Sequence, residues 1–385
     1  MGDKPSRRSR EQTKPMQVPM SRPDIGKAEI ELVNQVLRTP YLSTGPMLER
    51  FEQGMARCIG TQYAVGVSSG TAGLHLCVRA AGIDEGDEVI TTPFSFVASA
   101  NCVLYERARP VFVDIEPDSL NIDPQRIEDA VTPCTRAILP VHAFGQPADM
   151  APILDIARRH SVWVIEDACE AVGAEYKGRK AGTLSDAAVF AFYPNKQMTT
   201  GEGGIIVTDR DDWNALFRSL RNQGRDAFHA WLYHARLGYN YRLDELSAAL
   251  GVAQLQRIEG LLQKRERVAQ MYNERLAQID GVTLPFIAPT TTRLSWFVYV
   301  IRLSQGINRD TVMEKLEKRG IPSRPYFTPI HLQPFYRQMF GYQVGDFPVT
   351  ERVAERVLAL PFYGGMEEEK VDYVCVNLRD AIAHS

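Results

Sequence analysis

The chain has 385 residues, of which 44% are hydrophobic and 24% are charged. This is the composition of a globular protein, and the length suffices for one large domain and a smaller one. The formal net charge of -3 at pH 7 argues against nucleic acid as the main partner. No apolar run approaches the roughly 18 residues that a membrane-spanning helix needs, so we expect no membrane partner.

Cysteine and histidine spacing argues against two further kinds of site. The 6 cysteines are scattered and form no C-x-x-C pair, and the 7 histidines form no H-E-x-x-H motif. The sequence therefore indicates neither a zinc site nor a disulfide framework. We expect no bound metal and a reducing, cytoplasmic location.

The first 17 residues are basic, and no apolar stretch follows them. This pattern predicts a disordered basic tail rather than a secretory signal. Its cationic residues are Lys4, Arg7, Arg8, Arg10 and Lys14.

From residue 18 to about residue 260, apolar strand-like runs alternate with amphipathic helical stretches. Runs rich in Val and Ile that are separated by helices predict an α/β domain with a mostly parallel sheet, flanked by helices on both faces. Helices are expected at Thr71–Ala81, Phe96–Tyr105 and Met150–His160. Strands are expected at Tyr63–Val67, Glu88–Thr92, Pro110–Ile115, Ala137–His142, Val162–Asp167, Ala188–Tyr193 and Gly204–Thr208.

A long helix, which could be bent, is expected from Asp244 towards Asp280 and leads into a second domain. Residues 261–385 mix strand and helix patterns and predict a small C-terminal α+β domain. Its expected elements are a strand at Trp296–Leu303 and helices at Asp310–Arg319 and Thr350–Leu358.

The stretch Ser68–Gly73 (SSGTAG) follows a predicted strand and opens a helix. Glycine allows close backbone approach, and a helix N-terminus offers free N–H groups to a phosphate. An ordinary capped turn between strand and helix is the alternative, because such turns also favour Ser, Gly and Thr.

The expected strand Val162–Asp167 ends in two carboxylates, Glu166 and Asp167. An acidic side chain at the end of a buried strand is costly unless a cationic group meets it. The aspartate either binds a cationic ligand group or makes a structural salt bridge or helix cap, and these readings are about equally plausible.

The stretch AFYPNKQMTTGEGG, residues 191–204, places Lys196 between a strand end and a glycine-rich turn. A partly desolvated lysine loses its proton more readily than a surface lysine, and it can then form a Schiff base with an aldehyde. A surface lysine in a tight turn is the alternative. Together, a phosphate-binding turn, an acid for a protonated ring nitrogen and an amine for an aldehyde are what pyridoxal phosphate requires.

Five stretches together resemble the DegT/DnrJ-type sugar aminotransferases: SSGTAGLHL, TTPFSFVASANCVLY, EDACEAVGA, AFYPNKQMTTGEGG and LGYNYRLDELSAALG. The resemblance runs from about Val18 to the C-terminus. It implies a fold-type I architecture in which residues 18–260 bind the cofactor. It also implies an aminotransferase that uses pyridoxal 5'-phosphate and acts on nucleotide-linked keto sugars.

The resemblance also implies roles for individual residues. Lys196 would bond to the cofactor aldehyde and shuttle protons, and Asp167 would meet the pyridine nitrogen. Phe96 would stack on the ring, and Glu170 would lie near the ring hydroxyl. The phosphate would be bound by Gly70, Thr71 and Ala72.

A homodimer with shared active sites follows from the same resemblance. Asn240 resembles the residue that reaches the phosphate from the neighbouring subunit. Ala191 is a departure, because many members of the family carry a phosphate-binding serine at that position.

The substrates implied are a nucleotide-linked keto sugar and L-glutamate, with 2-oxoglutarate as the keto-acid product. Tyr326 and His331 lie in a segment that reaches the active site in the family, although this proline-rich segment could equally be structural packing. The stretch HAWLYH, residues 229–234, could line the nucleotide pocket. The N-terminal segments TPYLSTGP and SRPDIG look closer to members that act at C4 of the sugar, and action at C3 is the near alternative.

Three other activities remain open at this point. An aminotransferase acting on a keto-cyclitol would need the same cofactor residues. A sugar dehydratase is disfavoured, because related dehydratases carry histidine at the position of Lys196. A non-catalytic regulatory protein is disfavoured by the intact pair of Lys196 and Asp167.

Overall fold

The computed structural model describes residues 16–226, 233–383 and 385, so the basic residues of the expected tail lie outside the described residues. Within the described ranges, the central feature is a seven-stranded sheet with the order β1-β9-β8-β5-β4-β2-β3. Its strands are β1 (Tyr63–Val67), β2 (Glu88–Thr91), β3 (Arg109–Phe112), β4 (Thr135–Ile138), β5 (Trp163–Asp167), β8 (Ala187–Ala191) and β9 (Gly204–Thr208).

The sheet is parallel except for β9. This strand runs antiparallel to both of its neighbours, β1 and β8, whereas the other neighbouring strands pair in parallel. The prediction of a mostly parallel α/β sheet is confirmed, and β1 and β9 have the predicted bounds. β4 ends earlier than expected, shortly before Pro140, which has no N–H to donate to a ladder.

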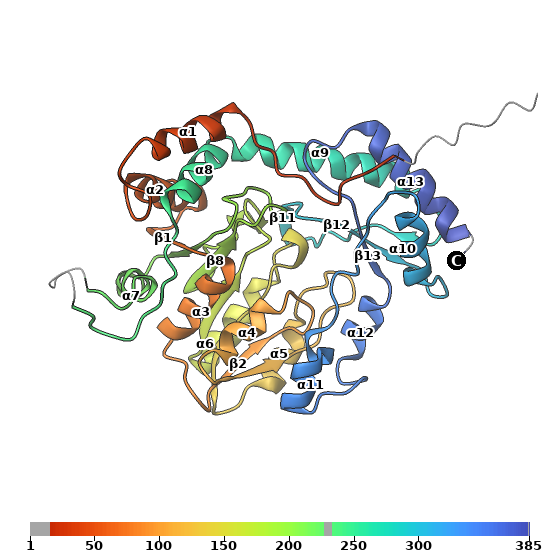
Figure 1. Ribbon diagram of the computed structural model, residues 1–385. Coiled ribbons are helices and arrows are strands. Elements are labelled where there is room, and N and C mark those ends of the chain that lie inside the picture. Colours follow the sequence, from red (N-terminus) through yellow and green to blue (C-terminus); the bar gives the residue numbers. More distant parts are fainter. Residues whose placement is uncertain (1–15, 227–232, 384) are drawn as a thin grey trace, which may run out of the picture.

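Helices cover both faces of this sheet (Figure 1). On one face, α3, α4 and α7 pack on alternate strand residues such as Val65, Val189 and Ile206. On the other face, α2 and α8 cover one half of the sheet, and α5 and α6 cover the other half. Their bounds are α2 (Pro46–Ile59), α3 (Gly70–Ala80), α4 (Ala98–Leu104), α5 (Pro124–Ala130), α6 (Met150–His160), α7 (Asp211–Arg221) and α8 (Glu245–Gln256).

The expected long helix is two helices. Arg257, with φ -123° and ψ 19°, separates α8 from α9 (Ile258–Leu276), so the bend allowed by the sequence lies at this residue. Asp244 begins α8, because its carboxylate accepts a hydrogen bond from the Ser247 N–H at 2.9 Å. From there α9 runs along one side of the molecule towards α13 (Glu368–Ala383) (Figure 1).

The C-terminal part is built on a small antiparallel sheet, β10-β12-β13. Large apolar side chains of α9, β12 and α13 form its core, among them the fully buried Tyr272 and Tyr299. A further small sheet has the order β11-β6-β7. The bounds are β6 (Glu175–Tyr176), β7 (Arg179–Lys180), β10 (Val282–Thr283), β11 (Thr291–Arg293), β12 (Tyr299–Leu303), β13 (Val357–Leu360) and α10 (Arg309–Glu317).

One predicted helix is wrong in its second half. The sequence predicts a helix over Thr350–Leu358, but α12 (Pro348–Ala354) ends early and the chain continues as β13. The reason is tertiary pairing, because Val357–Leu360 pairs with β12 and its four side chains are buried in two hydrophobic clusters. The remaining elements are α1 (Lys27–Leu37), α11 (Pro334–Phe340) and the short 3-10 helices η1 (Ala143–Gly145) and η2 (Ile330–Leu332). Across the described helices, none combines the length and apolarity that crossing a bilayer requires.

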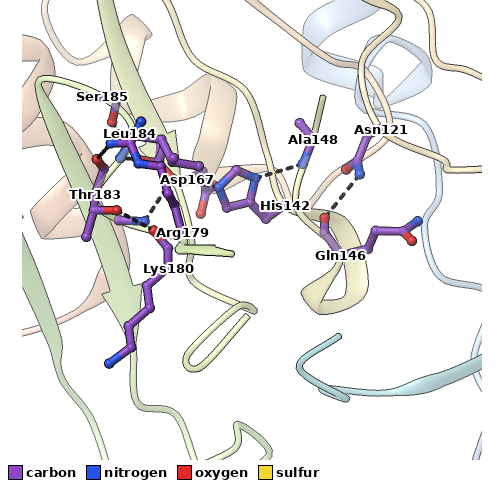
Figure 2. A network of polar contacts seen from close by, with 12 residues as sticks. Asn121, His142, Gln146, Ala148, Asp167, Arg179, Lys180, Thr183, Leu184 and Ser185 are labelled. Atoms are coloured by element: carbon purple, nitrogen blue, oxygen red, sulfur yellow. Dashed lines mark hydrogen bonds and ion pairs between the residues drawn. The ribbon is translucent and has the colours of Figure 1, made fainter. Parts of the chain in front are cut away.

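Glu166 is fully buried at the end of β5 and accepts four hydrogen bonds. Its donors are the His142 imidazole at 2.9 Å, the Ser185 hydroxyl at 2.8 Å and the backbone N–H groups of Gly182 and Leu184. His142 Nδ1 accepts from the Ala148 N–H, so its Nε2 carries the proton that is donated (Figure 2). This network ties β5 to the segments on both sides of it.

We predict that Glu166→Gln is strongly destabilising. An amide at this place presents a donor where four donors converge, which costs about 2–4 kcal/mol of unfolding free energy at neutral pH. Burial raises the pKa of Glu166, but the hydrogen bonds from His142, Gly182 and Ser185 outweigh it, and the pKa lies below the ordinary 4.5. The carboxylate therefore contributes its stability above pH 4.5 and loses it as the pH falls further.

Urea unfolding at several pH values tests this prediction. The stability gap between wild type and Glu166→Gln should narrow below about pH 4.5 as the wild-type carboxylate takes up a proton. Glu317→Gln, an exposed change on α10, is the control and should leave stability nearly unchanged. A gap that is small at neutral pH would contradict the structural role of Glu166.

Candidate active site

A cavity of about 480 Å³ lies where the parallel strands end. Residues that follow β1, β2, β5 and β8 reach it, and so does Gly203, because antiparallel β9 begins at the same edge. This is the edge at which α/β sheets bind ligands. Of the individual residues singled out in the sequence, those that line the cavity are Gly70, Thr71, Phe96, Asp167, Glu170, Ala191, Lys196 and Tyr326.

The start of α3 forms one end of the cavity. Ser69 is the N-cap, and its hydroxyl accepts a hydrogen bond from the Ala72 N–H at 3.1 Å. The first N–H groups of a helix have no partner within it, and Gly70 and Thr71 border the cavity at this point. A Cβ atom on Gly70 would lie 2.8 Å from Ala191 Cβ and 2.9 Å from Cys169 Sγ. Glycine is therefore required for this close packing, and an anion can approach the helix end.

Asp167 is 5% exposed and is held by two donors. The Ser99 hydroxyl donates to Oδ2 at 2.7 Å, and the Cys169 N–H donates to Oδ1 at 3.1 Å. The Ser95 Oγ lies 2.8 Å from the Ser99 Oγ. Because the Ser99 hydroxyl donates its proton to the Asp167 carboxylate, the Ser95 hydroxyl can donate to Ser99. A carboxylate offers about four acceptor positions, so Asp167 retains capacity for a cationic donor in the cavity.

Lys196 contacts an acid and an aromatic ring. Its Nζ lies 3.5 Å from Glu170 Oε1 and 3.9 Å from the centre of the Phe297 ring. The other oxygen of Glu170 accepts from the Phe144 N–H at 2.9 Å. Burial raises the pKa of Glu170, and the nearby Lys196 charge opposes that rise without cancelling it. The lysine amine thus lies beside a buried carboxyl group whose pKa is raised, as is common at functional sites.

Aromatic residues line the cavity, among them Phe96 and Tyr326, which were singled out from the sequence. Phe96 is 62% exposed, so one face of its ring is free to stack on a flat ligand. Tyr326 comes from the C-terminal part of the chain and is partly buried. Burial and the nearby Glu170 carboxyl raise the pKa of Tyr326, which keeps the phenol protonated as a donor.

Three of the expected site residues do not line the cavity. The Ala72 N–H is used by Ser69, as described above. His331 is fully buried, and its Nε2 bonds to Glu351 at 3.0 Å. Burial lowers the pKa of His331 more than Glu351 raises it, so this imidazole is neutral at pH 7. In this structure His331 is a packing residue among Tyr342 and Phe347.

Asn240 is exposed and lies away from the cavity of its own chain. Its backbone pairs with Asn222, and its neighbours Tyr239 and Tyr241 stack on each other with ring centres 5.0 Å apart. The segment is therefore held firmly while the amide side chain faces outward. Of the stretch 229–234, residues 229–232 lie outside the described residues.

Several residues at the site were not found from the sequence. Ser95 and Ser99 are four residues apart, a spacing that places two side chains on one face of a helical turn. This spacing is the pattern from which they could have been predicted. Phe297 had none, because it comes from a stretch of ordinary strand-like residues. Asn195 borders the cavity, and its Oδ1 is buried without a hydrogen-bond partner among the described residues.

Comparisons with known proteins show the family. A family model described as the DegT/DnrJ/EryC1/StrS aminotransferase family matches residues 23–379. GDP-perosamine synthase of Caulobacter vibrioides is 41% identical over 365 residues, which covers 94% of this chain and 97% of the relative.

Solved structures agree as well. DesV of S. venezuelae, in complex with a ketimine intermediate, has a TM-score of 0.86 at 36% identity over 91% of this chain and 93% of that chain. The putative sugar aminotransferase Spr1654 of Streptococcus pneumoniae, in its PLP-form, has a TM-score of 0.91 at 26% identity, with 96% and 99% covered.

The chain belongs to the DegT/DnrJ/EryC1/StrS aminotransferase family. It is a pyridoxal-phosphate-dependent sugar aminotransferase with the fold-type I architecture.

The residues present fit this cofactor. An anion-binding helix end, a buried carboxylate with free acceptor capacity, an exposed aromatic face and a lysine surround one cavity, and the unpartnered Asn195 Oδ1 adds a polar contact. Within the described part of the chain, no group of three or more His, Cys, Asp and Glu residues is placed to hold a metal ion.

We predict that Gly70→Ala weakens binding of pyridoxal phosphate about tenfold, because the new methyl group displaces the start of α3 from Ala191 and Cys169. The dissociation constant can be measured by absorbance titration of the cofactor-free protein. Gly260→Ala on α9 is the matched control, since its Cβ would meet nothing within 4 Å. Equal affinity in the two variants would contradict a phosphate site at this turn.

Proposed function

We propose that this enzyme transfers the amino group of L-glutamate to the C4 carbonyl of a nucleotide-linked keto sugar. The observation that carries the proposal is the convergence of Lys196, Asp167 and the start of α3 on one cavity. The identity to GDP-perosamine synthase, whose name specifies a GDP-linked sugar, supports a nucleotide-linked substrate. The resemblance of the N-terminal segments to members that act at C4 supports that position.

When bound, pyridoxal phosphate supplies an aldehyde that bonds to amines and a ring that accepts electrons from the adjacent carbon. The residues that would hold it are Gly70 and Thr71 at the phosphate, Asp167 at the ring nitrogen and Phe96 on the ring face. Asp167 would keep the ring nitrogen protonated through a charge-assisted hydrogen bond. Ser99 fixes the rotamer of that carboxylate.

Lys196 would move the proton. Its Nζ would accept the proton released at the substrate carbon and would deliver it to a second carbon, which is general base and then general acid work by one amine. Glu170, 3.5 Å from Nζ, would hold the amine in place between these steps. Tyr326 would contact the sugar from the C-terminal part of the chain, and the nucleotide would bind further out.

We also propose a homodimer with shared sites. Exposed apolar side chains add apolar surface at two places, the cavity lining with Phe96 and Tyr193 and the segment before Asn240 with Tyr233 and Leu237, the last being 77% exposed. Such a surface is stabilised by burial against another subunit. Asn240 would then reach the phosphate in the partner's cavity.

The first experiment measures the half-reaction with glutamate. Wild type loaded with pyridoxal phosphate should show a visible absorbance band that bleaches when L-glutamate is added, with release of one equivalent of 2-oxoglutarate. Lys196→Ala should form no such band, because it has no amine to bond to the aldehyde. Lys180→Ala, an exposed lysine elsewhere on the chain, should behave as wild type.

The glutamate-treated enzyme is then offered 4-keto and 3-keto sugars linked to different nucleotides, and a keto-cyclitol. Return of the band with a 4-keto nucleotide sugar, and an amine at C4 in the product by NMR, is the expected result. Return of the band only with the 3-keto sugar or the keto-cyclitol would replace the proposed substrate. A band that ignores glutamate would overturn the proposed donor.

Shared sites predict rescue between two inactive variants. A mixture of Lys196→Ala and Asn240→Ala chains, unfolded together and refolded, should recover about a quarter of wild-type activity, because half of the dimers carry one intact site. If both residues serve the same subunit, no site in the mixture is intact and activity stays at the level of the separate variants. Each variant refolded alone is the control.

A further inference from the structure

Arg265 on α9 is a buried cation without an acidic partner. It is 4% exposed, and among the described residues no carboxylate lies within ion-pairing distance of its guanidinium. Burial lowers the pKa of Arg265 to about 10, so the group remains charged at pH 7. Asp24 favours the charge only from a distance, and its own carboxylate is bonded to Arg257 and Lys264.

The guanidinium bonds instead to four backbone carbonyl groups. One nitrogen donates to Lys196 O at 2.7 Å and to Asn195 O at 3.1 Å. The other donates to Phe297 O at 3.0 Å and to Trp296 O at 3.4 Å. The two pairs of carbonyls lie about 100 residues apart in the sequence, and Arg265 joins them.

These carbonyls need a partner from outside the sheets. Asn195 and Lys196 lie in the turn after β8, and Trp296 and Phe297 lie just before β12. Buried carbonyl groups outside a ladder must be satisfied by another donor. A planar group with five N–H donors can serve two such sites at once, which lysine cannot do with one compact ammonium group.

Both pairs of carbonyl groups that Arg265 bonds belong to segments that restrict the position of the Lys196 amine. The first is the peptide of Lys196 itself. The second carries Phe297, whose ring centre lies 3.9 Å from Lys196 Nζ. An ammonium group over a ring face is attracted by it, so the ring restricts where Nζ can lie. One guanidinium group therefore restricts the position of both the backbone and the amine of Lys196.

The neighbouring arginines on the same helix region differ. Arg257 makes ion pairs with Asp24 and with the buried Glu29, and Arg275 pairs with Asp372 and Glu368. Those cations tie carboxylates on different segments together. A buried unpaired cation is costly, and at Arg265 the cost is offset by the four carbonyl groups and by the ring of Phe362, whose centre lies 5.6 Å from the guanidinium carbon.

We propose that Arg265 is a positioning residue that holds Lys196 where it can bond to the cofactor aldehyde, through the Lys196 peptide and through Phe297. The inference rests on the covalent role proposed above for Lys196. It goes beyond that role, because it assigns the orientation of the amine to a side chain that does not touch the cofactor.

The test compares two forms of the cofactor. Pyridoxal phosphate can bond to Lys196, whereas pyridoxamine phosphate carries an amine and cannot. If Lys196 is no longer held in position, only the binding of pyridoxal phosphate should weaken. For Arg265→Lys we expect the dissociation constant of pyridoxal phosphate to rise about tenfold and that of pyridoxamine phosphate to change less than about twofold.

Two further variants keep the test decisive. Phe297→Leu removes the ring face and leaves the carbonyl bonds to Arg265, so we expect a smaller loss of about threefold, again for pyridoxal phosphate only. Arg267→Lys is the matched control, since this arginine on α9 also donates to a carbonyl, that of Met366, away from the cavity. It should leave both affinities unchanged.

The outcomes separate the possible explanations. An equal loss for both ligands in Arg265→Lys would show that the arginine only maintains the fold, and unchanged affinities would show that it has no role in binding. Lys196→Ala is measured alongside. If Lys196→Ala also fails to separate the two ligands, the covalent role of Lys196 is wrong. If it separates them and Arg265→Lys does not, only the positioning inference is overturned.

Discussion

The site depends on the alternation of side chains along β5. Successive residues of a strand point to opposite faces, so the adjacent carboxylates Glu166 and Asp167 are directed apart. The Glu166 side chain is buried, and its carboxylate accepts hydrogen bonds from His142 and from the turn at residues 182–185. Asp167 enters the cavity, where Ser99 holds one oxygen and acceptor capacity remains. A one-residue shift of β5 would exchange these environments and leave the cavity without its acid.

Much of this arrangement follows from patterns that the sequence displays. The strands β1 and β9 were predicted to their last residue, because apolar runs there are bounded by polar turns. Gly70, Asp167 and Lys196 were predicted as site residues because each lies at or beyond the end of a strand, and parallel strands bring their carboxyl ends to one edge. The C-terminal part was predicted less well, since β13 has a pattern that local propensity reads as helix and only pairing with β12 decides otherwise.

The contacts that the sequence could not give are those made by residues of common types at long range. Arg265 lies in a helix with many charged residues, and its burial appears only when α9 packs under the turn at Lys196. Phe297 looks like any core aromatic residue. His331 shows the converse, because a histidine in an aromatic segment suggests binding, and packing places it beside Glu351 instead. Recognition of motifs identifies which chemistry is present, whereas orientation of the reacting groups is set by these distant contacts.

The reversed direction of β9 has a consequence for how the chain folds. Because β8 and β9 are antiparallel neighbours, the segment that carries Lys196 connects them locally, and no crossover helix intervenes. Contacts between residues close in sequence form at a lower entropic cost than distant ones. The β8–β9 hairpin that carries Lys196 can therefore form early. Arg265 on α9 and Phe297 before β12 pack against it only after the last third of the chain has folded. Chains truncated before α9 would then contain the lysine loop without Arg265 and Phe297, which position the amine.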